Sequence, residues 1–196
     1  MAKTDLDATS PALLSATASA PASAYDMGAR TEVEGAATFA VLVDNEPGVL
    51  HRVVGLFAAR GYNIESLTVA ETDRGRHTSR ITIVTRGTPH VLSQIEAQLK
   101  KMVSTRQVQN VTTDPNGVER ELALVKVRNA GSDRLEAKLL ADIFRAKVID
   151  TTTTGFIFEI TGAPAKIDKF VGLMAPLGLV EVSRTGVLSI ERAAEG

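Results

Sequence analysis

A single order of strand-like and helix-like segments occurs twice along this 196-residue chain, and this repeat limits its possible folds more than any other feature. Short runs rich in β-branched residues predict strands, whereas apolar residues three and four positions apart predict helices. The polar residues 71–76 lie between two expected strands, which should therefore form a hairpin. In the first half we expect a strand, a helix, two strands, a helix and a strand, at residues 39–43, 49–60, 62–70, 79–86, 89–103 and 107–113.

The second half repeats this order after Asp114-Pro115-Asn116-Gly117, a segment that interrupts both periodicities. Gly186 is expected to bend or bulge the last strand. The helix over 133–146 should face inward with its apolar residues Leu135, Leu139, Ile143 and Phe144. We expect the strands and helices of this half at residues 122–127, 133–146, 148–152, 156–160, 165–177 and 180–190.

The order β-α-β-β-α-β is that of the ferredoxin-like fold. The sequence therefore predicts an α+β protein with two consecutive ferredoxin-like units, residues 37–113 and 118–196. In each unit two helices should cover one face of a sheet, because the helix stripes are apolar and the strands alternate. Side-by-side pairing of two chains would protect an exposed edge strand, so we expect a homodimer.

The alternation within the strand over 62–70 predicts which side chains share a face. Ile64, Ser66 and Thr68 are expected on one face, and Leu67 and Val69 on the other.

Residues 1–36 are rich in Ala, Ser, Thr and Pro and have no sustained period, which predicts a disordered tail. Its leucine pair lies in no long apolar core, as a secretory signal would require. Asp5 and Asp7 argue against an organelle transit peptide. No apolar run approaches the ~18 residues that span a bilayer. The absence of cysteine is compatible with a reducing cytoplasm, where we expect the protein to reside.

Composition and motifs exclude several classes of function. A formal net charge of −1 does not favour nucleic acid as a partner, and the absence of cysteine excludes thiolate catalysis and zinc–thiolate sites. The histidines His51, His77 and His90 lack the spacing of a metal site, so we expect no metal. No phosphate-binding glycine motif or nucleophile elbow is present. With no catalytic residues expected, the pattern indicates a binding or regulatory protein.

The segment between the first strand and the first helix is the strongest candidate for a ligand site. Asn45 is a possible helix cap, Pro47 suits a first helical turn, and Gly48 lets a ligand approach the backbone. Unpaired N–H groups at such a helix start favour a carboxylate. The alternative is an ordinary capped helix after a strand, and the residues by themselves leave both readings open.

Two sets of residues resemble a known family. The first contains Asn45-Glu46-Pro47-Gly48-Val49-Leu50, residues 55–57, and residues 60–69 with the run Gly61-Tyr62-Asn63-Ile64-Glu65-Ser66-Leu67. The second comprises residues 119–122, 143–145, 148–150, 180–182 and 184–187. Together they closely resemble the small, regulatory subunits of acetolactate synthase (acetohydroxyacid synthase), over residues 37–190.

The resemblance implies that the first unit is an ACT domain, which binds an amino acid and dimerises, and that residues 118–196 form the C-terminal regulatory-subunit domain. It also implies a separate catalytic subunit as partner, which uses thiamine diphosphate, magnesium and FAD in branched-chain amino-acid biosynthesis. This chain would activate that subunit, hold no cofactor itself and confer feedback inhibition by valine, with leucine and isoleucine as further candidates. The effector site would combine Asn45, Pro47, Gly48, Val49 and Leu50 of one chain with Asn63 and Ile64 of another.

Two other functions remain open at this point. One is a free-standing amino-acid sensor that regulates another enzyme or transcription, although no helix-turn-helix pattern supports it. The other is an enzyme on the ferredoxin-like fold, which the poor inventory of nucleophiles and paired bases disfavours.

Overall fold

A computed structural model of the chain describes residues 33–73 and 75–193. The disordered tail expected for residues 1–36 therefore lies almost entirely outside the described residues. Only residues 33–36 of it are described, and the first strand already begins at Gly35. Within the described parts, no helix is both long and apolar enough to span a membrane.

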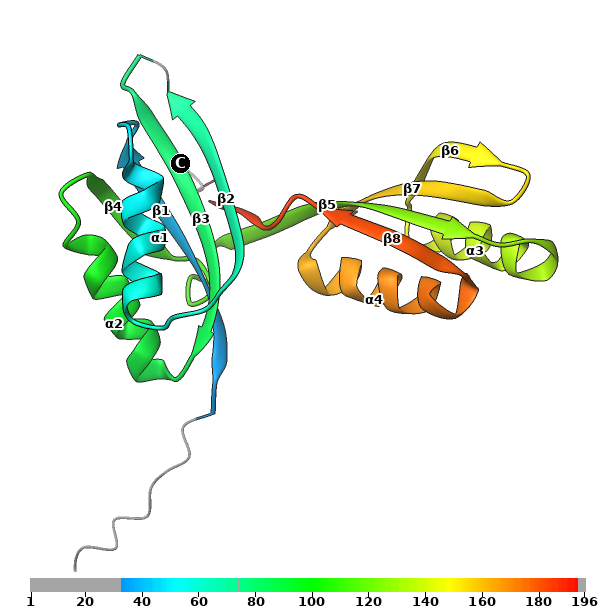
Figure 1. The fold of residues 1–196 in the computed structure, drawn as a ribbon, viewed down its shortest axis with the longest axis horizontal. Helices are drawn as coiled ribbons and strands as arrows, with labels where there is room; N and C mark the ends of the chain where they lie inside the picture. The colour runs from blue at the N-terminus through cyan, green and yellow to red at the C-terminus, as the bar shows by residue number, and fades with distance from the viewer. Residues whose placement is uncertain (1–32, 74, 194–196) are drawn as a thin grey trace, which may run out of the picture. The chain divides into compact units, whose positions relative to one another are not determined.

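The first unit is an antiparallel sheet with two helices on one face, as the sequence predicts (Figure 1). Its strands lie in the order β2-β3-β1-β4. Large apolar side chains of the helices, such as Phe57 and Leu99, are fully buried against Phe39 and Ile83 of the sheet. The elements are β1 (Gly35–Asp44), α1 (Val49–Ala59), β2 (Ile64–Asp73), β3 (Thr78–Gly87), α2 (Pro89–Lys100) and β4 (Thr105–Asn110).

The second unit repeats this arrangement, with strand order β6-β7-β5-β8 and both helices on one face (Figure 1). Its core contains an aromatic cluster in which Phe158 and Phe170 meet edge to face at 6.1 Å. The prediction of two ferredoxin-like units is confirmed. The elements are β5 (Gly117–Arg128), α3 (Gly131–Ile143), β6 (Lys147–Thr152), β7 (Gly155–Gly162), α4 (Pro164–Met174), the 3-10 helix η1 (Ala175–Leu177) and β8 (Leu179–Arg184).

Helix α3 turns a different face to the core than the sequence predicts. Ala137 and Ala141 are fully buried, whereas Leu135, Leu139 and Ile143 are 74%, 60% and 64% exposed. Both sets recur every four residues, so periodicity by itself cannot choose between them. Ala137 and Ala141 belong to the same core cluster as Phe158 and Phe170, and Phe144, directly after the helix, packs against this cluster as predicted.

The expected last strand over 180–190 is two strands. β8 ends at Arg184, and after the turn at Gly186 (φ 83°) a separate strand, β9 (Leu188–Glu191), follows. β9 pairs with Gly117–Arg120 of β5, whereas residues 123–127 of β5 pair with β8. The two ends of β5 therefore belong to different strand pairs, which the sequence pattern does not reveal.

Strand β2 also departs from simple alternation. Ile64 pairs with Thr85 of β3 and Ser66 with Val84, so Glu65 forms a bulge. The extra residue moves Ile64 to the core side with Leu67, away from Ser66 and Thr68. The prediction that Ile64 shares a face with Ser66 is therefore wrong. The strand also continues to Asp73, through residues that were expected to form the hairpin turn.

Candidate functional site

The turn between β1 and α1 differs in detail from a capped helix. α1 begins at Val49, and Gly48 occupies the cap position in the left-handed conformation (φ 81°) without a side-chain cap. Asn45 does not cap the helix, because it lies three residues before the cap position; its Nδ2 donates to Glu71 Oε1 at 3.5 Å. Pro47 precedes the cap instead of standing in the first helical turn. Glycine is required here because a left-handed residue bearing a Cβ is strained.

Several N–H groups of this turn have no internal acceptor. Asn45 N donates to His77 O at 2.7 Å and Val49 N to Glu46 O at 3.2 Å, which holds the turn in place. Among the described residues, none accepts a hydrogen bond from the N–H of Gly48, Leu50 or His51. The first turn of α1 also contains no acidic residue. These donors at the positive end of the helix dipole suit a carboxylate from outside the unit.

The side chains around the turn divide into apolar and charged groups. Val49 is buried in the core, so only its backbone is available to a ligand, whereas Leu50 is 39% exposed. Glu46 is paired with Arg52 at 3.1 Å, which offsets the one carboxylate within the turn. The turn therefore combines exposed N–H donors, an exposed apolar side chain and an amide at Asn45.

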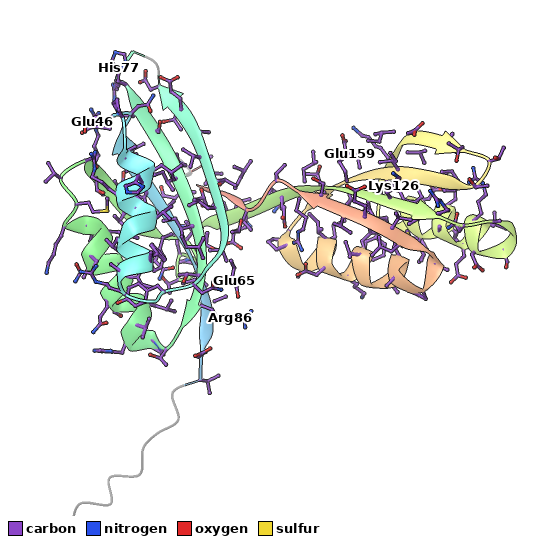
Figure 2. The ribbon with its side chains drawn as sticks, viewed as in Figure 1. Glu46, Glu65, His77, Arg86, Lys126 and Glu159 are labelled. Atoms are coloured by element: carbon purple, nitrogen blue, oxygen red, sulfur yellow. The ribbon has the colours of Figure 1, made fainter. Side chains whose placement is uncertain are left out.

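Asn63 and Ile64 lie at the opposite end of the sheet from this turn. Figure 2 shows Glu46 and His77 at one end, and Glu65 and Arg86 at the other. On β1, Ala37 pairs with Thr85, the neighbour of Ile64, whereas Asp44 pairs with Thr78. At about 3.3 Å per residue, the seven steps from Ala37 to Asp44 separate the two ends by about 23 Å. One chain therefore does not bring the two halves of the predicted site together.

The Asn63 end has its own open hollow. Arg60, Tyr62, Asn63 and Arg86 are among the residues that line a cavity of about 500 Å³. The backbone O of Asn63 accepts a hydrogen bond from Thr85 Oγ1 at 2.6 Å, which orients the residue. Its exposed side-chain amide has no hydrogen-bond partner among the described residues.

The histidines are not brought together. His51 lies on the exposed side of α1, His77 in the β2–β3 turn and His90 at the start of α2. Over residues 33–73 and 75–193, no three or more His, Asp or Glu side chains are grouped to hold a metal ion.

Sequence reasoning did not find a charged cluster at the end of β8. Arg184 donates to both carboxylate oxygens of Glu121, at 2.8 and 2.5 Å, and to Asp168 at 2.7 Å. The hydrogen bonds from Arg184 to Glu121 raise the pKa of the guanidinium above its usual value, against the opposing effect of burial. A cavity of about 500 Å³ lies beside this cluster, lined also by Ser66 and Gly186. Residues 119–122 and 184–187 were both among the residues that resemble the family, but the sequence did not indicate that Arg184 contacts Glu121.

Comparison with known proteins assigns both units to the family that the sequence resembles. Residues 39–107 match the family model "AHAS small subunit-like ACT domain", and residues 120–193 match "Small subunit of acetolactate synthase". The chain is 45% identical over 155 residues to a probable acetolactate synthase small subunit of Archaeoglobus fulgidus, covering 79% of this chain and 96% of that protein. It is 44% identical over 153 residues to the isozyme 3 small subunit of Escherichia coli, covering 78% and 93%.

Solved structures also include a similar protein. The crystal structure of the acetolactate synthase small subunit from Thermotoga maritima has a TM-score of 0.72 and 40% sequence identity. The match covers 82% of this chain and 99% of that one.

Proposed function

The chain belongs to the acetolactate synthase small-subunit family, and from this premise we propose that it activates the catalytic subunit and makes it sensitive to valine. As a regulatory subunit it acts with a separate large subunit. In this proposal the large subunit holds thiamine diphosphate, magnesium and FAD and performs all of the chemistry. This chain supplies no catalytic residue, and its ligand is valine or a related branched-chain amino acid.

The edge position of β2 supports a composite site between two copies of the chain. β2 is one of the two edge strands of the first sheet, and β4 is the other. If it pairs antiparallel with the partner's β2 about a two-fold axis, the Asn63 end of one strand lies beside the Glu71 end of the other. Asn45 already contacts Glu71, so the partner's Asn63 then approaches the turn. Pairing of the two edges would also remove an exposed edge strand from each copy.

The chemistry of this composite site matches an apolar amino acid. The N–H groups of Gly48, Leu50 and His51 suit the carboxylate, and the amide oxygens of Asn45 and the partner's Asn63 suit the ammonium group. Leu50 and the partner's Ile64 offer apolar surface to the side chain. One methylene changes apolar burial by about 0.8 kcal/mol, so such a pocket separates valine from leucine or isoleucine only modestly. The unpaired N–H groups of the turn are the observation that carries the proposal.

Gly48→Asp tests the assignment of the turn. It places a carboxylate where that of the effector would lie, so we expect valine inhibition to be lost while activation of the catalytic subunit is retained. Gly48→Asn is the matched control, because Asn introduces a side chain of the same size without the charge. The measurement is activity of the reconstituted complex with and without valine. Unchanged inhibition in Gly48→Asp would contradict the site.

A further inference from the structure

The segment after β8 lies against β2, the strand that follows Asn63 in the first unit. Val187 N donates to Ser66 Oγ at 3.3 Å, and Thr68 Oγ1 donates to Val187 O at 3.0 Å. Two residues further on, Ser189 O accepts from Arg80 Nη1 at 3.0 Å. Both polar groups of the Val187 backbone are therefore bound by side chains of β2, on the face of the sheet opposite the helices.

Gly186 makes this close approach possible. Its backbone is left-handed (φ 83°), and a Cβ built on it would lie 2.5 Å from Ser66 Oγ and 2.9 Å from Thr68 Cγ2. A side chain here would separate Val187 from the same two residues that bind it. The hydrogen bonds and the glycine thus describe one tight contact between β2 and the segment.

The other end of the segment is fixed to the second unit. Arg184 binds Glu121, which is only 3% exposed, and also reaches Asp168 of α4. The next residue, Thr185, donates its N–H to Leu122 O at 3.0 Å and accepts from Leu122 N at 3.2 Å through Oγ1. Arg184 and Thr185 therefore move with β5 and α4.

We propose that residues 184–187, which we call the 184–187 link, are positioning residues. When an effector binds at the Asn63 end of β2, the link transmits this binding to the C-terminal unit. Asn63 directly precedes β2 and Ile64 begins it, and Ser66 and Thr68 of the same strand bind Val187. A displacement of β2 by a ligand at Asn63 therefore acts on Val187 after only a few residues, and Arg184 passes it to Glu121. This inference rests on the proposed function and adds to it the route from effector to regulation.

Thr68→Val tests the β2 end of the link. It removes the hydroxyl donor to Val187 and keeps the size of the side chain. In the reconstituted complex we expect activation without valine to be unchanged and the calorimetric affinity for valine to stay within about threefold of the wild type. Residual activity at saturating valine should rise at least about twofold, because binding no longer reaches the second unit. Thr68→Ser, which retains the hydroxyl, should restore full inhibition.

Thr72→Val is the matched control on the same strand. Thr72 Oγ1 donates to Thr78 O at 3.3 Å and makes no hydrogen bond to the 184–187 link. We expect this variant to be inhibited as the wild type is. Equal and complete inhibition of Thr68→Val and Thr72→Val would overturn the link while leaving the proposed function intact. If the wild-type complex neither binds nor responds to valine, the proposed function fails first, and the link fails with it.

Glu121→Gln tests the other end. Loss of the carboxylate charge weakens the interaction with Arg184. We therefore again expect the affinity for valine to be retained while inhibition of the complex by valine is reduced. Glu119→Gln, on the same strand, is the control, since no ion pair of Glu119 is present among the described residues. Retention of full inhibition by Glu121→Gln would show that the second unit does not depend on this contact.

Discussion

Asn45 and Asn129 occupy equivalent positions in the two units and have different roles. Each follows the first strand of its unit, and each donates its backbone N–H to the turn of the neighbouring hairpin, at His77 O and Thr154 O respectively. The Asn45 side chain is exposed and reaches only Glu71. The Asn129 side chain is 8% exposed and donates to Leu177 O and Asp133 O.

The helices that follow these two residues also differ in the charge of their first turns. α1 has no acidic residue in its first turn, whereas α3 carries Asp133 there. A carboxylate in the first turn partly offsets the positive end of the dipole. The start of α3 therefore carries a negative charge of its own, whereas the start of α1 carries none. At the same fold position, the second unit has a buried side chain that bonds within the unit, and the first has the exposed side chain that we propose for ligand binding.

The largest difference between the units should appear at two left-handed glycines, Gly178 and Gly48. In Gly178→Ala the new Cβ would lie 2.1 Å from Arg128 O, whereas at Gly48 the nearest atom is the movable Arg52 Nη1, at 3.9 Å. Gly48→Ala should therefore cost only the left-handed strain of about 1–2 kcal/mol. We expect Gly178→Ala to unfold the second unit, because strain and a backbone clash combine. Thermal unfolding followed by circular dichroism measures the stability of both variants. Equal losses of stability would contradict the expected difference between the two glycines.

The two asparagines should separate stability from binding. Asn129→Ala removes the buried hydrogen bond to Leu177 O, so it should lower the free energy of unfolding by about 1–3 kcal/mol. Asn45→Ala, at an exposed position, should stay within about 0.5 kcal/mol of the wild type and weaken valine binding instead. Urea denaturation and calorimetry together distinguish the two. If Asn45→Ala proved as destabilising as Asn129→Ala, the division of roles between the units would be wrong.

The smallest effect is expected at the exposed stripe of α3. Leu139→Ala should change the free energy of unfolding by less than about 0.5 kcal/mol, because the side chain is 60% exposed. The same substitution at the fully buried Leu99 of α2 should lower it by about 2–5 kcal/mol. Chemical denaturation of both variants makes the comparison. A large loss for Leu139→Ala would indicate that the stripe is covered in the protein in solution.

The order of elements and the candidate turn could be predicted because both depend on local signals. Strand and helix periods, Pro47 and Gly48 act over a few neighbouring residues, and the structure contains an element of the expected type at each place, although the last strand is divided into β8 and β9. The errors share one physical origin. The inward face of α3, the bulge at Glu65 and the separate strand β9 all depend on residues that are distant in the chain. Asn45 is not the helix cap, because α1 begins only at Val49, after Gly48 in the cap position.

The amino-acid sequence by itself determined the repeated ferredoxin-like order, the family and the residues of the turn, since these follow from short-range patterns and from likeness to relatives. Only the tertiary structure decided that Asn45 is exposed while Asn129 is buried, and that Gly186 lets Val187 reach β2. It also placed the turn and Asn63 at opposite ends of one sheet. Burial and backbone approach are set by what packs around a residue, and that information is spread over the whole chain.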